Sequence, residues 1–96
     1  MSSRARRKQN RRDAVSHVIG RIGSDMFTTA EVWETGQRLI RTGVPWPRYL
    51  KNAWRGLRGA QHVGNVIARH PAYERADEGG NSRYIDDTRT ALWVRR

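Results

Sequence analysis

The chain has 96 residues, which is enough for one domain, and a formal net charge of +10. It contains no cysteine, which excludes a disulfide framework and a thiolate metal site. No apolar run approaches the roughly 20 residues that a membrane span needs, and no apolar stretch follows the charged N-terminus as in a signal peptide. We therefore expect an intracellular, cytoplasmic protein (nucleoid-associated if bacterial) that binds a polyanion and not a membrane.

The basic residues concentrate in two zones. Residues 1–12 carry six basic side chains and no acid, and residues 35–73 carry seven and no acid. The first zone has no core-forming residue after Met1, so we expect a disordered basic arm that follows phosphates or enters a minor groove, or else a solubilising end. Its basic members are Arg4, Arg6, Arg7, Lys8, Arg11 and Arg12.

The first predicted helix spans residues 13–22 and precedes a short strand. Apolar side chains recur there at the spacing of one helical face; they are Ala14, Val15, Val18, Ile19 and Ile22. Gly23 follows and ends the helix. The apolar pair Met26–Phe27 then predicts a brief strand.

A second helix is predicted to begin after Thr28, where Thr28 and Glu31 form a capping-box pattern, and to close at Gly43. Gly36 lies among its apolar residues and indicates a close approach of another element. A third helix begins at Pro47, which can occupy the first helical position.

A fourth helix is predicted from about residue 59 to residue 69, after two interrupting glycines. Residues 72–76 and 83–86 then read as two strands, with turn-forming residues 77–82 between them, which predicts a β-hairpin. The apolar end, residues 91–94, is expected to pack back on the domain as a strand or short helix.

This order of elements resembles the winged helix-turn-helix family of DNA-binding proteins. Three stretches carry the resemblance: MFTTAEV, RGLRGAQHVGNVIARHP and YERADEGGNSRYI. The resemblance implies an α+β fold, mainly helical with a small β-hairpin, in which residues 13–96 form one domain behind the arm. It implies a recognition helix at 59–69, a wing, and a homodimer on two half-sites. The additional helix near 47–56 departs from the family, because it lengthens the turn before the recognition helix.

The outward face of the fourth helix carries side chains suited to reading bases. Arg58, Gln61, Asn65 and Arg69 share one face, and His62 lies beside it. Arg can contact guanine through two hydrogen bonds, and Gln or Asn can contact adenine in the same way. Gly59 and Gly64 would let the backbone approach the DNA closely. Further backbone contacts are expected from Lys51, Arg55, Arg75, Arg83 and the six basic residues of the arm.

Nothing in the chain predicts an enzyme, a cofactor or a metal site. His17, His62 and His70 have no ligand spacing and no accompanying cysteine. Asp86 and Asp87 are neighbours that point to opposite faces in a strand, which suits turn chemistry better than acid–base catalysis.

Three functions remain open at this point. The first is a sequence-selective duplex DNA-binding protein, such as a small transcriptional regulator of the kind phages encode. The second is an RNA- or single-strand-binding protein, which the arm and an exposed Trp46 would favour. The third is a module that binds a protein partner and inhibits or redirects a host machine. For a homodimer, the candidate contacts are residues 14–22 and 92–94, although either segment fits a core equally well.

Overall fold

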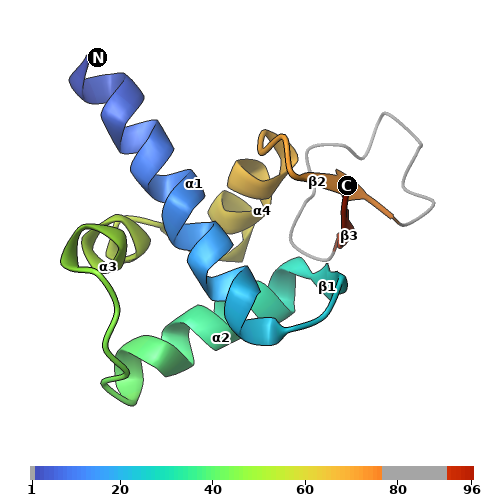
Figure 1. The fold of residues 1–96 in the computed structure, drawn as a ribbon, viewed down its shortest axis with the longest axis horizontal. Helices are drawn as coiled ribbons and strands as arrows, with labels where there is room; N and C mark the ends of the chain where they lie inside the picture. The colour runs from blue at the N-terminus through green and yellow to red at the C-terminus, as the bar shows by residue number, and fades with distance from the viewer. Residues whose placement is uncertain (1, 77–90) are drawn as a thin grey trace.

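The computed structural model describes residues 2–76 and 91–96 and shows a mainly helical α+β fold (Figure 1). Four helices and a small antiparallel sheet follow in chain order: α1 (Ser3–Ile22), β1 (Met26–Thr28), α2 (Thr29–Arg41), α3 (Arg48–Arg55), α4 (Ala60–Ala68), β2 (Tyr73–Arg75) and β3 (Leu92–Arg95). The helices α2, α3 and α4 lie where the sequence predicts them, α1 begins ten residues earlier than predicted, and the apolar C-terminal end is a strand.

The expected disordered arm is wrong, because residues 3–12 form the first half of α1. The Ser2 hydroxyl caps the helix by accepting a hydrogen bond from the Ala5 amide at 3.2 Å. Gln9 donates to Asp13 at 2.9 Å, one turn further along. Arg, Lys, Gln and Ala are good helix formers, so a helix nucleated by its buried half extends easily through them.

Residues 13–22, the buried half of α1, contribute the centre of the core. Ala14, Val15, Val18 and Ile19 are completely buried there. Gly23 ends the helix with a positive φ of 74°, a left-handed conformation that glycine adopts without strain. The apolar face of α1 is therefore occupied within one chain.

The sheet has the strand order β1-β3-β2. Phe27 of β1 lies opposite Trp93 of β3, and Trp93 in turn lies opposite Arg75 of β2. The Trp93 indole donates to the Thr29 hydroxyl at 2.7 Å, which fastens the sheet to the start of α2. The predicted pairing of residues 72–76 with 83–86 cannot be followed, since 83–86 lie outside the described residues. Within the described residues, β2 pairs with β3.

The capping box that opens α2 is confirmed. The Thr28 hydroxyl accepts from the Glu31 amide at 3.1 Å, and the Glu31 carboxylate accepts from the Thr28 amide at 3.1 Å. The close approach at Gly36 is confirmed too, because a Cβ there would overlap the Trp54 indole of α3. Trp54 is buried, and its Nε1 donates to Gln37 at 3.0 Å.

Trp46 is not an exposed platform for a partner. It is half-buried against the core, and its ring stacks on His17 with centroids 5.1 Å apart. The ring centroid of Trp46 also lies 6.3 Å from that of Trp54. The proline-rich connector thus turns Trp46 inward over the junction of α1 and α3.

A polar network ties α1 to the C-terminal end of α4. The His70 Nδ1 accepts a hydrogen bond from the Ala72 amide at 3.1 Å, so the ring proton is on Nε2. Nε2 donates this proton to the Ser16 hydroxyl at 2.8 Å. The Tyr73 hydroxyl also donates to Ser16, at 3.3 Å. Burial lowers the pKa of His70, and nearby Arg12 lowers it further while Asp13 raises it. The neutral imidazole is therefore the form that this network holds.

Candidate nucleic-acid interface

The first half of α1, residues 3–12, extends beyond the rest of the molecule, with α3 on one side of the helix and α4 on the other (Figure 1). Residues 2–9 are exposed. We call residues 3–12 the projecting half of α1. Since α-helices repeat every 3.6 residues, Arg4, Arg7, Lys8 and Arg11 continue the face that carries Ala14 and Val18 lower down. These four cations therefore lie on the side of α1 that faces the rest of the molecule, and together they line one hollow.

A groove separates the projecting half of α1 from α4. We call it the α1–α4 groove; its volume is about 220 Å³. Lys8, Arg11 and Arg12 form its α1 wall. Its α4 wall carries His62, Asn65, Val66 and Arg69, which repeat at the spacing of one helical face. Among the described residues, no carboxylate lines the groove, so an anion would meet cations on both walls.

The predicted stripe on α4 continues from this groove toward the start of the helix. Arg58, Gln61, His62 and Asn65 border an adjoining hollow. The Gln61 amide donates to the Asn65 oxygen at 3.2 Å, so the two side chains orient each other. The structure thus brings the stripe together on one accessible surface.

His62 links this surface to the turn before α4. Its Nδ1 accepts from the Arg58 amide at 3.2 Å, which leaves the proton on Nε2. Burial lowers the pKa of His62, and the positive charges of Arg11 and Arg58 lower it further.

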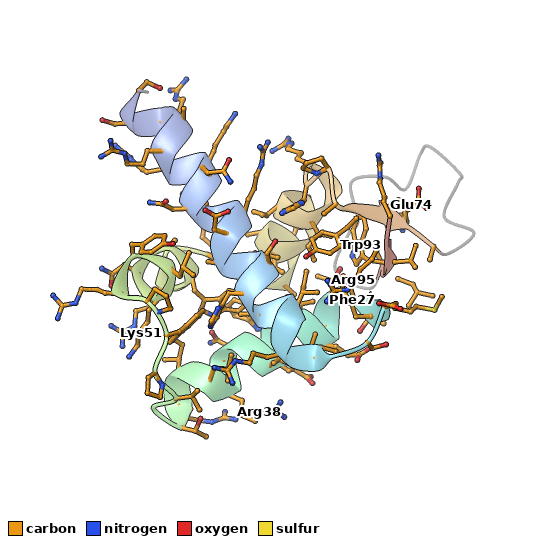
Figure 2. The ribbon with its side chains drawn as sticks, viewed as in Figure 1. Phe27, Arg38, Lys51, Glu74, Trp93 and Arg95 are labelled. Carbon is orange, nitrogen blue, oxygen red and sulfur yellow. The ribbon has the colours of Figure 1, made fainter. Side chains whose placement is uncertain are left out.

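The cations here differ in pairing from those at the sheet. At the sheet, Arg95 lies 3.6 Å from the Asp25 carboxylate, and Arg96 lies 3.9 Å from that of Glu74. Figure 2 shows Glu74 and Arg95 near that sheet. Five cations line the α1–α4 groove or the adjoining hollow at the start of α4: Lys8, Arg11, Arg12, Arg58 and Arg69. Across the part of the chain that the structure describes, no carboxylate forms an ion pair with any of them. Their charge remains available to a ligand.

Several of the predicted contact residues lie elsewhere. Arg6 lies roughly 140° from Arg11 around α1, away from the hollows. Lys51 and Arg55 are on α3, which lies on the opposite side of α1 from α4 (Figures 1 and 2). Arg75 is half-buried in β2, and Arg83 lies outside the described residues.

Gly64 cannot provide the predicted close approach to DNA, because it lies on the buried face of α4. Gly59 lies at the start of α4 and borders the hollow that Arg58 and Gln61 share. Of these two glycines, Gly59 alone therefore remains a candidate for that approach.

Sequence reasoning missed a second groove, on the other side of α1. Its α1 wall carries Arg7, Asn10 and Arg11, and its α3 wall carries Tyr49, Asn52, Ala53 and Gly56. We call it the α1–α3 groove. The sequence contains its signal, since positions 49, 52, 53 and 56 repeat at helical spacing. Leu50 and Trp54 occupy the buried face of α3, whereas Tyr49 is 55% exposed.

Other kinds of site find less support. Within residues 2–76 and 91–96, no three His, Asp or Glu side chains gather closely enough to hold a metal ion. The same part of the chain has no helix with the length and apolar character needed to cross a bilayer. The two segments considered for a dimer place Val15, Val18 and Trp93 in the core of one chain.

No protein-family model, curated protein or solved structure matches this chain. Its function therefore has to be argued from its own residues.

Proposed function

We propose that this chain is a sequence-selective duplex DNA-binding protein of the winged helix-turn-helix kind, a small transcriptional regulator. The observation that carries the proposal is the α1–α4 groove. There, the cations of α1 lie beside the face of α4 that carries Gln61, His62 and Asn65, and none of the described lining residues is a carboxylate.

The order of elements supports this proposal. A helix, a strand and a capped helix precede α4, and the antiparallel strands β2 and β3 follow it. The helix α3 between α2 and α4 is the departure from the family's order of elements. A recognition helix needs a free outer face and a supported inner face. On α4, Val63 and Ile67 are completely buried and support the helix, whereas Gln61 and Asn65 are half-buried and Arg69, at the C-cap, is exposed.

The chemistry of contact divides between the two helices. On α4, the amide pair Gln61 and Asn65 matches the N6 and N7 groups of adenine, and Arg58 matches guanine. On α1, Lys8, Arg11 and Arg12 would neutralise the phosphates beside the base pairs that α4 reads.

The helical form of residues 3–12 changes how the N-terminus would bind. An α-helix with side chains is about 10–12 Å across, whereas the minor groove is about 6 Å wide. The projecting half of α1 therefore cannot enter a minor groove as an extended arm would. It can follow phosphates along the edge of the major groove.

The test is a duplex-DNA titration repeated across salt, followed by selection from a random-sequence pool. We expect a log–log slope of roughly −5 to −8, which corresponds to about six to nine phosphate contacts. Asn65→Ala and Gln61→Ala should relax the selected sequence at a cost of about 1–3 kcal/mol each. No duplex binding at low salt would overturn the proposal, and an unchanged preference in both variants would refute base reading by α4.

A further inference from the structure

We propose that the α1–α3 groove binds an unpaired nucleotide of single-stranded nucleic acid, with its base stacked on Tyr49. This is a second binding site, distinct from the α4 face, and it does not require that the protein bind a duplex.

The aromatic surface in this groove is open. Tyr49 is 55% exposed, and its ring contacts no other ring among the described residues. The other described aromatic residues, with the indole of Trp93 included, are at least half-buried. An exposed tyrosine alone needs no explanation. This one borders a groove of about 380 Å³, within the range of about 300–1,000 Å³ that is common for ligand sites.

The groove also offers polar groups for a base. The Asn10 amide comes from α1 and the Asn52 amide from α3, so they stand on opposite walls. Within the described residues, neither side chain has a hydrogen-bond partner. Each amide can donate and accept, which suits the mixed edge of an unpaired base.

Phosphate contacts come from the arginines at the rim. Arg7 and Arg11 line the groove, and none of its described lining residues is a carboxylate. Arg11 also lines the α1–α4 groove, so the two grooves meet across one side chain. A strand that leaves a duplex on α4 could therefore pass over Arg11 and place its next base against Tyr49. Open aromatic rings and a cationic backbone track are the two features that single-strand sites combine.

The proposal is tested with three probes at equal salt: a blunt duplex, the same duplex with a short overhang, and the free single strand in DNA and RNA forms. We expect Tyr49→Ala to weaken binding of the single strand, and to remove any gain from the overhang, by roughly 5- to 100-fold. Tyr49→Phe keeps the stacking surface and should stay close to wild type. Met26→Ala is the matched control, because Met26 is 50% exposed but lies at the sheet.

Two results would overturn this inference: unchanged single-strand binding by Tyr49→Ala, or an equal loss on the blunt duplex. The outcomes also separate it from the proposed duplex function. Single-strand binding that depends on Tyr49, without duplex binding, refutes only the duplex function. Duplex binding with no contribution from the overhang refutes only the groove. The DNA and RNA strands show which sugar the groove accepts, and a photo-crosslink from 5-iodouracil to Tyr49 would place the base directly.

Discussion

The two halves of α1 share one continuous helix but lie in opposite surroundings. The buried half packs Val15, Val18 and Ile19 into the core with no exposed surface. The projecting half exposes residues 3–9 and is stabilised by the Ser2 cap and the Gln9–Asp13 hydrogen bond. One half therefore stabilises the fold by apolar burial, and the other presents cations on an exposed helical backbone.

This difference implies that stability and binding are separable along one helix. Substitutions in the buried half should lower the free energy of unfolding, whereas substitutions in the projecting half should weaken binding and leave the core intact. The following predictions test that separation, from the largest expected effect to the smallest.

The largest effect is expected from Ile19→Ala. Ile19 is completely buried, so its truncation removes apolar contacts and leaves a cavity. The free energy of unfolding should fall by about 2–5 kcal/mol in chemical denaturation. A loss well below that range would mean that the core collapses around the site, or that α1 is less firmly packed than its burial indicates.

Arg11→Ala should weaken nucleic-acid binding by about 10- to 100-fold, as expected for the loss of a charge-assisted contact. The magnitude of the log–log salt slope should also fall by about 1, as expected for the loss of one phosphate contact. Arg6→Ala is the matched control, since it removes the same charge from the opposite side of the projecting half. Equal losses in the two variants would show that net charge alone drives binding, and that the grooves have no special role.

Acidification should lower the free energy of unfolding through His70, which joins α4 to Ser16 of the buried half. The folded pKa of His70 lies below the ordinary 6.5, mainly because the ring is buried. The unfolded chain therefore takes up the proton first, and stability falls as the pH drops below about 6.5. His17 and His62 shift in the same direction.

His70→Asn isolates the contribution of this residue. It keeps an acceptor for the Ala72 amide but does not titrate, so denaturation between about pH 7 and pH 5 should show a shallower decline than in the wild type. An equally steep decline in the variant would assign the pH dependence to other groups.

The smallest effect on global stability is expected from Ser2→Ala. Loss of the cap costs about 0.5–2 kcal/mol of local helix stability. Because residues 2–9 are exposed, the core should not register that loss. Hydrogen exchange should become faster at the amides of the first turns only. A large drop in the unfolding midpoint would mean that the two halves of α1 are energetically coupled.

Local chemistry made much of this fold predictable. The capping box at Thr28, the left-handed stop at Gly23 and the helix of residues 60–68 depend on neighbours within one or two turns. The stripe of Gln61, Asn65 and Arg69 follows from helical spacing in the same way. For these features, the sequence alone was sufficient because each is settled by side chains close along the chain.

The tertiary structure decided the features that join distant segments. Residues 3–12 read as a disordered arm because they bury nothing themselves; they are helical because they continue a helix whose other half lies in the core. Trp46 is covered by His17, 29 positions earlier, and Trp54 lies against Gly36, 18 positions earlier.

The two grooves exist only because α3 and α4 pack on either side of α1. Spacing along the chain shows which residues share a face of one helix. It does not show which faces of different helices meet, because that depends on how the whole core closes.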